Sequence, residues 1–269
     1  MKTDSMKFGI VWNKQKQGAA SVKEQLVSLL DEKNISHRFI TDRKTLSENA
    51  EGLDVLFIIG GDGTILRFAD VCAQKHIPIC GINAGHIGFL TEVSSDDLSE
   101  CIDAILHQNY EIESRMMLSC YVNGEYLRDC LNDVVFMKKT HSGIARLSYA
   151  TRSEFMKSVS CDGMIIYTPT GSTGYNISAG GPVLEPFMNA IGITPICPHT
   201  IYAKPFVISS DDYLELSTET DGIVSVDGQM IAEIKNGHRI TITESKEKAS
   251  FIRLRKNYIF DMIKNKLDE

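Results

Sequence analysis

The chain has 269 residues, of which 43% are hydrophobic and 23% are charged. This is the composition of a globular protein with room for one large domain or two smaller ones, and it excludes disordered, collagen-like and coiled-coil proteins. With 28 Lys and Arg against 35 Asp and Glu, the net charge of -7 leaves no broad positive field for a nucleic acid or an anionic membrane. Any phosphate that the protein binds must therefore be held by a few local groups.

Targeting and cross-linking signals are lacking in the sequence. Its longest strongly apolar runs, such as residues 55–59, fall far short of the roughly 18 residues of a membrane helix. Residues 1–7 are polar and have no signal-peptide core, so we expect a cytoplasmic protein without a membrane partner. The seven cysteines are scattered and form no C-x-x-C pair, which favours buried, reduced thiols over a disulfide scaffold or a structural zinc.

The first part of the chain alternates strand and helix patterns. We predict strands at residues 7–12, 37–40, 54–59 and 77–82, and helices at 20–33, 64–75 and 96–107. Such alternation is typical of a parallel sheet with helices on its faces. The sequence therefore predicts an α/β N-terminal domain with a Rossmann-like parallel sheet.

Strand patterns dominate from residue 111 onward. We predict strands at residues 118–122, 131–137, 164–168, 213–217, 223–226 and 239–243, separated by Asn-Gly and Asp-Gly turns. The expected organisation is thus an α/β domain at 1–112 and a mostly β domain at 113–250. Residues 251–269, with a short helix at 260–267, are expected to pack back on the first domain.

A glycine-rich turn follows the predicted strand at 54–59. Gly60-Gly61-Asp62-Gly63-Thr64 would lie at the carboxyl edge of the parallel strands, where ligands bind and where glycines let phosphate oxygens approach backbone N–H groups. The structural alternative is a tight turn with Asp62 or Thr64 as a helix N-cap. The spacing matches neither a Walker loop nor G-x-G-x-x-G, which disfavours a P-loop kinase and a dehydrogenase.

A second segment, residues 168–182, packs hydroxyl and small residues around a single aromatic ring. Its glycines and prolines are unsuited to a regular helix or a central strand. Its many polar groups indicate either a ligand rich in oxygen atoms or a surface loop that satisfies itself through Ser/Thr turns.

Two further polar features interrupt the strand patterns. Asn132-Asp133 breaks an apolar strand, either as a bulge or turn or as a pair that holds ribose hydroxyls. Asp227-Gly228 before Gln229 predicts a type I′ hairpin. His86 and His199 have no metal-ligand partner at useful spacing, so we interpret both as loop or core histidines.

Several separated motifs together resemble those of bacterial NAD kinases (polyphosphate/ATP-NAD kinases). They occur in family order over nearly the whole chain: GGDGT at 60–64, GINAGHIGFL at 81–90, Asn132-Asp133, CDG at 161–163, TPTGSTGYNISAGGP at 168–182, PHT at 198–200 and DGQ at 227–229. GGDG alone is shared with lipid kinases related to diacylglycerol kinase and with phosphofructokinases. The specific motif is TPTGST followed by a tyrosine and SAGGP.

The resemblance implies that the domain at 1–112 binds nucleotide and that the domain at 113–250 binds NAD. It also implies the roles of individual residues. Asp62 matches the catalytic acid that accepts the proton of the ribose 2′-hydroxyl, Arg67 matches a basic position close to phosphate, and Phe89 matches an aromatic near the adenine. The other positions that match substrate contacts are Gly63, Asn132, Asp133, Asp162, Thr173, Gly174, Tyr175, Asn176, Ile177, Ser178 and Gln229.

This sequence departs from the family pattern at a few positions. Asp133 replaces a commoner glutamate, Gly174 a usual alanine and Cys161 a typical glycine. Ser160 stands where many members have a basic residue, for which Lys157 could substitute.

The resemblance implies phosphoryl transfer from ATP or polyphosphate to the 2′-hydroxyl of the adenosine ribose of NAD, giving NADP. It also implies Mg²⁺ or another divalent cation, whose ligands the sequence does not identify, and a homodimer or homotetramer. Two alternatives remain: a lipid kinase of the GGDG superfamily, and a non-catalytic dinucleotide-binding protein. The TPTGST segment argues against the first alternative, and the presence of Asp62 argues against the second.

Overall fold

Two compact units make up the chain. The computed structural model describes residues 6–85, 88–140, 143–152 and 156–254. Unit 1 comprises residues 1–114 together with 249–269, and unit 2 comprises residues 115–248. The helix expected at 260–267, and with it most of the predicted segment 251–269, lies outside the described residues.

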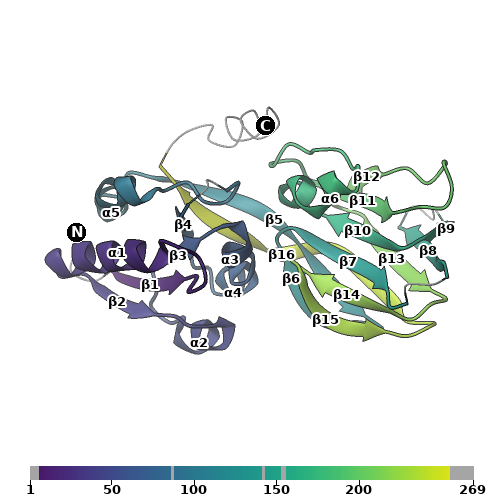
Figure 1. Cartoon of the computed structure of the whole chain (residues 1–269), viewed down its shortest axis with the longest axis horizontal. Helices are drawn as coiled ribbons and strands as arrows, with labels where there is room; N and C mark the ends of the chain where they lie inside the picture. Colours follow the sequence, from purple (N-terminus) through teal and green to yellow (C-terminus); the bar gives the residue numbers. More distant parts are fainter. Residues whose placement is uncertain (1–5, 86–87, 141–142, 153–155, 255–269) are drawn as a thin grey trace. The chain divides into compact units, whose positions relative to one another are not determined.

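Unit 1 is the α/β unit that the sequence predicts (Figure 1). Its helices and strands alternate along the chain. They are β1 (Lys7–Trp12), α1 (Ala19–Glu32), β2 (Ser36–Phe39), α2 (Arg43–Asn49), β3 (Val55–Gly60), α3 (Asp62–Leu66), α4 (Ala69–Gln74), β4 (Ile79–Asn83), a 3₁₀ turn (Ser95–Asp97) and α5 (Leu98–Leu106).

The sheet of unit 1 is parallel. Its order is β2-β1-β3-β4, and β4 pairs with the end of the last strand, β16 (Arg239–Arg253), where Phe251 lies opposite Ile79. Arg253 then donates hydrogen bonds to Glu113 Oε1 (2.8 and 3.0 Å) and to the carbonyl oxygen of Leu90 (3.3 Å). The end of the described chain thus adds a parallel strand to the N-terminal sheet beside β4.

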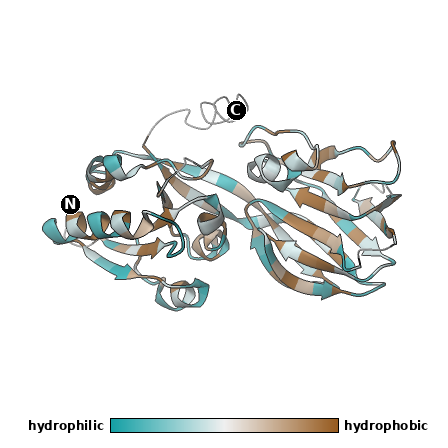
Figure 2. Ribbon diagram, in the orientation of Figure 1, coloured by the Kyte–Doolittle hydropathy of each residue, from teal (hydrophilic) through white to brown (hydrophobic). Residues whose placement is uncertain are grey.

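Apolar residues at helical spacing attach α1 to this sheet. Val22, Leu26 and Leu30 are buried in one core cluster with β1, β3, β4 and α5, and Figure 2 shows hydrophobic and hydrophilic residues alternating along α1. Every residue of β3 is buried, as a central parallel strand requires when both faces are covered. The glycine-rich turn therefore follows a strand that is buried along its whole length.

One predicted helix of unit 1 is wrong in its extent. Instead of a single helix at 64–75, the structure has α3 and α4, separated at Arg67 and Phe68. Phe68 is the N-cap of α4, with φ -119° and ψ -12°, and its side chain is 1% exposed. Burial of this ring takes precedence over a continuous helix, because packing outweighs helix propensity.

Unit 2 is almost entirely β-structure. Its strands and short helices are residues 115–122 of β5 (Glu111–Val122), β6 (Glu125–Cys130), β7 (Asp133–Lys138), β8 (Ala145–Thr151), β9 (Met156–Cys161), β10 (Gly163–Tyr167), a 3₁₀ helix (Thr170–Thr173), α6 (Tyr175–Ser178), β11 (Ala190–Ile196), β12 (Phe206–Ser209), β13 (Tyr213–Thr218), β14 (Gly222–Val226), β15 (Gln229–Ile234) and residues 239–248 of β16.

Two sets of antiparallel strands share one core in this unit. One sheet has the order β12-β11-β10-β7-β14-β15, and the other set runs β16-β13-β8-β9, with β5 and β6 paired beside β16. Apolar side chains from both, among them Phe136, Leu147, Ile166 and Leu216, belong to a single buried cluster. This is the mostly β domain that the sequence predicts.

The turn chemistry of unit 2 is also as expected. Asp227 and Gly228 have φ of 48° and 73° and join β14 to β15 in a two-residue loop, which confirms the predicted hairpin. The segment 168–182 differs from expectation, because it forms the 3₁₀ helix and the single helical turn α6.

The cysteines are free thiols. Six are buried and only Cys197 is exposed, as the composition predicts for small apolar side chains. None of the helices in the described part of the chain is both long and apolar enough to cross a membrane.

Candidate active site

Asp62 is held by backbone groups at the carboxyl edge of the unit 1 sheet. It is the first residue of α3, directly after the Gly60-Gly61 turn that ends β3. Its Oδ2 accepts a hydrogen bond from the N–H of Phe89 (2.8 Å) and its Oδ1 accepts one from that of Leu90 (3.0 Å). A Cβ at Gly88 would lie 2.0 Å from Oδ1, so any larger residue there would displace the carboxylate. The GGDGT and GINAGHIGFL motifs therefore meet at this carboxylate.

The helix-cap interpretation of this turn is wrong. The N-cap of α3 is Gly61, which has no side chain, and neither Asp62 nor Thr64 caps the helix. The carboxylate of Asp62 is directed to another loop instead. Its structural role is to hold the backbone of Phe89 and Leu90.

The remaining predicted residues of unit 1 surround this turn. Gly63 is exposed, with no atom within 4 Å of a Cβ built on it. Arg67 is exposed at the C-cap of α3, where its guanidinium lies 5.9 Å from the ring centroid of Phe68. Phe89 contributes its backbone N–H to the carboxylate of Asp62, and His86 lies outside the described residues.

In unit 2, Asp227 organises the Asn132-Asp133 pair. Its Oδ2 accepts a hydrogen bond from the N–H of Leu131 (2.9 Å), and its Oδ1 accepts from those of Asn132 (2.7 Å) and Asp133 (3.2 Å). The N–H of Asp227 donates to the carbonyl oxygen of Asp133 (2.9 Å). The predicted strand at 131–137 accordingly begins at Asp133, with a regular register to β10, so the polar pair marks a strand end rather than a bulge.

Both carboxyl groups of this arrangement resist ionisation. Burial raises the pKa of Asp133 from 3.8 to about 6. Removal of the Asp227 carboxyl from water raises its pKa from 3.8 to about 7, although the three backbone N–H groups favour the charged form. The two acids therefore hold protons at pH values where exposed carboxyls have lost them.

This difference predicts a pH dependence of stability. Between pH 4 and 7 the folded state binds more protons than the unfolded chain, so the free energy of unfolding should fall as the pH rises. The slope is at most about 1.4 kcal/mol per pH unit for each group, and it levels off above the folded pKa values. Urea denaturation across this range should show a shallower fall for Asp133→Asn than for the wild type. The exposed Asp211→Asn is the control, and equal slopes for Asp133→Asn and wild type would contradict the prediction.

The segment 168–182 packs directly on Asn132. A Cβ at Gly171 would lie 2.1 Å from the carbonyl oxygen of Asn132, and one at Gly174 would lie 3.3 Å from Asn132 Nδ2 and 3.9 Å from Asp133 Oδ2. Thr168 donates its N–H to Asn132 O (2.9 Å). Among the described residues, the buried Oδ1 of Asn132 has no hydrogen-bond partner. An acceptor that is kept from water without a partner is a candidate for a ligand donor.

Within that segment the predicted residues divide into two groups. Asn176 is fully buried, where its Nδ2 donates to Ser172 O and Pro182 O (both 2.9 Å) and its Oδ1 accepts from Thr194 Oγ1 (2.7 Å). Its side chain therefore supports the loop. The other group is at least partly accessible and consists of Thr173, Gly174, Tyr175, Ile177 and Ser178.

Asp162 and Gln229 have partners of their own. Asp162 Oδ1 lies 2.6 Å from the Nζ of Lys138, and this hydrogen bond lowers the pKa of the carboxyl. Gln229 Oε1 accepts a hydrogen bond from Arg128 (2.8 Å). A ligand that binds Asp162 would compete with Lys138, and one that binds Gln229 would compete with Arg128.

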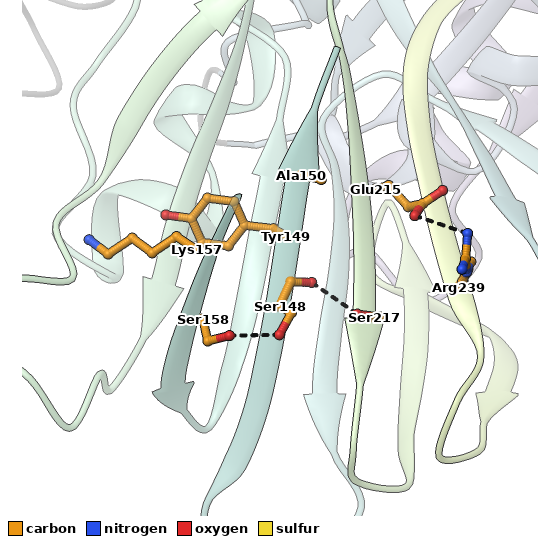
Figure 3. A pocket seen from close by; sticks show the side chains of 8 residues that line it. All are labelled: Ser148, Tyr149, Ala150, Lys157, Ser158, Glu215, Ser217 and Arg239. Atoms are coloured by element: carbon orange, nitrogen blue, oxygen red, sulfur yellow. Dashed lines mark hydrogen bonds and ion pairs between the residues drawn. The ribbon is translucent and has the colours of Figure 1, made fainter. Parts of the chain in front are cut away.

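A pocket of about 320 Å³ lies elsewhere in unit 2, on the sheet that contains β8, β9, β13 and β16 (Figure 3). Across its floor Ser148 bonds to Ser158 (2.7 Å between hydroxyl oxygens), and Ser217 donates to Ser148 O (3.4 Å). Lys157 also lines the pocket, and its Nζ donates to Tyr202 O (3.3 Å). None of the fourteen residues predicted as catalytic or substrate-binding is among its lining residues.

The sequence analysis missed the role of Asp227 in holding the Asn132-Asp133 pair. Asp227 was interpreted as a turn residue alone, and its contacts lie about a hundred positions away along the chain, as in the 96-residue separation to Leu131. The signal was available in part, because an Asp-Gly hairpin close to an Asn-Asp break offers a carboxylate to strand-end N–H groups.

In the described part of the chain, no group of three or more His, Cys, Asp and Glu residues could hold a metal ion.

Comparison with protein families finds two matching models. The ATP-NAD kinase N-terminal domain matches residues 33–110, and the ATP-NAD kinase C-terminal domain matches residues 131–254. Together they include both the Asp62 turn and the Asn132–Asp227 arrangement.

Two similar proteins are both named NAD kinase. An NAD kinase of Moorella thermoacetica is 34% identical over 98% of this chain and 89% of its own length. One of Lachnoclostridium phytofermentans is 34% identical over 98% of this chain and 99% of its own.

Two solved structures share the fold. An NAD kinase from Archaeoglobus fulgidus in complex with ATP has a TM-score of 0.79 at 27% identity, over 98% of this chain and 99% of its own. Yeast NADH kinase complexed with NADH has a TM-score of 0.88 at 19% identity, over 98% of this chain and 87% of its own, and this similarity concerns the fold alone.

Proposed function

The chain belongs to the NAD kinase family of ATP-dependent phosphotransferases, and on that premise we propose that it transfers a phosphoryl group to the 2′-hydroxyl of the adenosine ribose of NAD. Asp62 accepts the proton of that hydroxyl. The observation that carries this role is the fixation of both carboxylate oxygens by the N–H groups of Phe89 and Leu90. Such fixation holds a base in one position, which phosphoryl transfer requires because it depends chiefly on positioning and charge.

In the same proposal the domain at 113–250 binds NAD. Asn132 and Asp133 hold ribose hydroxyls, supported by the unpartnered Oδ1 of Asn132 within the described residues. The accessible residues of the 168–182 segment, with Asp162 and Gln229, supply further contacts. Asn176 acts by positioning its neighbours Tyr175 and Ile177, because its own side chain is buried and bonded.

Binding of a divalent cation is also proposed, in a particular form. The described residues offer no cluster of three or more potential ligands. Mg²⁺ can nevertheless bind through substrate phosphates, water and one or two protein oxygens. Asp62 and the buried Asn83 Oδ1, which has no partner in the described ranges, are the oxygens of unit 1 that suit this arrangement. When bound, the ion would neutralise negative charge on the phosphoryl oxygens.

The proposal also includes the oligomeric state and the cellular location of the enzyme. A homodimer or homotetramer and a cytoplasmic location rest on the family resemblance. Light scattering coupled to gel filtration tests the first of these. A monomer at micromolar concentration would overturn it.

One experiment tests the function itself. Purified protein is incubated with NAD, Mg²⁺ and either ATP or polyphosphate, and formation of NADP is measured. Turnover with either donor supports the proposal and defines the donor range. Saturable NAD binding without turnover would identify a non-catalytic dinucleotide-binding protein instead.

A prediction about Asn132 separates binding from stability. Asn132→Ala should weaken NAD binding by about 1–3 kcal/mol, typical of a lost buried polar contact, with little change in melting temperature. Asn176→Ala is the matched contrast, because it removes hydrogen bonds to Ser172, Pro182 and Thr194. This variant should lower the melting temperature more than Asn132→Ala does. Calorimetric titration with NAD and thermal denaturation measure both. A less stable Asn132→Ala protein with unchanged NAD affinity would refute the binding role.

A further inference from the structure

Three loops meet at the carboxyl edge of the parallel sheet in unit 1. They follow β1, β3 and β4, which are neighbours in the order β1-β3-β4. Lys16 belongs to the first of these loops, and its Nζ donates a hydrogen bond to the carbonyl oxygen of Gly60 (3.1 Å) in the second. A cation from the start of the chain thus lies on the glycine-rich turn next to Asp62.

Two glycines leave room around this ammonium group. A Cβ at Gly61 would lie 3.4 Å from Lys16 Nζ, and one at Gly85, in the third loop, would lie 3.3 Å from Lys16 Cε and 3.7 Å from Nζ. An ammonium group has three N–H donors, and one is used by Gly60. No ion pair of Lys16 occurs among the described residues, so its charge is not neutralised by a carboxylate there.

This position differs from that of the cation predicted from the sequence. Arg67 was expected close to phosphate, but its guanidinium lies near the ring of Phe68 at the far end of α3. Lys16 lies at the glycines themselves. In a chain with net charge -7, a polyanionic donor depends on such local positive charges.

We propose that Lys16 binds the phosphate chain of the phosphoryl donor, with its ammonium group donating to a phosphate oxygen above the Gly60-Gly61 turn. This role rests on the proposed function and extends it to a residue outside the recognised motifs. Lysine is suited to it, because its ammonium is a point charge that can keep the bond to Gly60 O while a second N–H turns to the ligand. The chemistry recognised is a chain of phosphates, whether it belongs to ATP or to inorganic polyphosphate.

The test compares Lys16→Met with Lys14→Met. Lys14 is in the same loop and exposed, with its Nζ 5.4 Å from the ring centroid of Trp12, so its replacement removes the same charge away from the glycines. Lys16→Met should raise the KM for ATP by about 10- to 100-fold, as expected for a lost charged hydrogen bond. The KM for NAD should change little, and Lys14→Met should behave as the wild type.

Lys16→Gln separates binding from a structural role. Glutamine can still donate to a carbonyl oxygen but has no charge, so the proposal predicts a raised donor KM here too. If Lys16 only ties the turn, Lys16→Met should lower the melting temperature and kcat with an unchanged donor KM, and that result would overturn the proposal.

Direct binding provides a readout that does not depend on turnover. Calorimetric titration with tripolyphosphate and with ATP, each without NAD, should show weaker binding of both to Lys16→Met than to the wild type. Weakened binding of ATP alone would overturn the proposal, since Lys16 would then recognise the nucleoside. If the wild type binds tripolyphosphate through Lys16 but phosphorylates no NAD, the proposed function fails while this inference stands.

Discussion

Asp62→Asn should lower the turnover of NAD by about 10²- to 10⁴-fold, the usual effect of losing a general base. An amide cannot take the proton of the ribose hydroxyl or place a negative charge beside it. NAD affinity should change much less, because the carboxylate acts mainly in the transition state. Initial rates of NADP formation, together with NAD titration, measure both quantities.

The same substitution has a structural consequence that must be measured alongside. Both oxygens of Asp62 accept backbone N–H groups, whereas asparagine has one oxygen and would turn its NH₂ toward either Phe89 or Leu90. We expect a loss of stability of about 1–3 kcal/mol for the unsatisfied N–H. Such a loss leaves most molecules folded in a protein of ordinary stability, so it cannot account for the fall in turnover.

Asp42→Asn is the matched control for Asp62→Asn. Asp42 also accepts a backbone N–H, that of Thr45, but it does so as the N-cap of α2, away from the turn. Asparagine caps a helix about as well as aspartate, so this variant should keep both stability and turnover. Turnover of Asp62→Asn within a few-fold of the wild type would require another base.

The second large effect is expected for Gly171→Ala. A Cβ there would lie 2.1 Å from the carbonyl oxygen, 2.5 Å from the carbonyl carbon and 2.7 Å from the Cα of Asn132. These are backbone atoms, so no rotation of a side chain relieves the contact, and the segment must move away from the Asn132-Asp133 pair. We expect a loss of stability of about 3 kcal/mol or more, above the usual range for overpacking with side chains.

Gly174→Ala provides the comparison, because Gly174 approaches the same residue, Asn132, less closely. Its Cβ would lie 3.2 Å from Gly171 O and 3.3 Å from Asn132 Nδ2, contacts that a shift of a few tenths of an ångström relieves. Denaturation and NAD titration should therefore show a mild effect for this variant and a severe one for Gly171→Ala. Similar stabilities for the two would show that the chain near Asn132 yields more easily than the structure indicates.

The elements that the sequence predicts best are those with a local signal. The strand at 7–12 coincides with β1, and the two-residue Asp227-Gly228 turn joins β14 to β15 as expected. Both follow from residues within a few positions of each other, an apolar run in one case and a pair with positive φ in the other.

Strands that use small polar residues were missed. In β8, the buried positions include Ala145 and Thr151, and in β9 Ser158 and Ser160 alternate with Val159 and Cys161. These residues give a weak hydrophobic pattern, and cross-strand partners such as Ser148 and Ser158 stabilise the pairing instead. The strand predicted at 239–243 was too short, because β16 continues to Arg253. Residues 244–248 are mostly charged and therefore give no hydrophobic pattern for the second part of this strand.

The candidate site shows the same division. The site position of Asp62 could be predicted because it comes directly after a buried strand. The glycines beside it could be predicted because a tight turn requires that residue type. The carboxylate of Asp227, the close approach of Gly171 and the position of Lys16 depend on residues that meet only in the folded chain. The contact of Lys16 with Gly60 spans 44 positions, which no local pattern encodes.

The strand that pairs with β4 comes from the end of the described chain, and this has a consequence for how the protein is made. Residues 249–253 of β16 complete the sheet beside β4, and Arg253 fastens them to Glu113 and Leu90. A ribosome delivers the chain from its N-terminus, so β4 emerges early and its open edge must wait until all of unit 2 has been translated. Unpaired edges are where nascent chains associate wrongly. Unit 2, a contiguous stretch, can fold first, and the unit that carries Asp62 closes last although most of it is synthesised first.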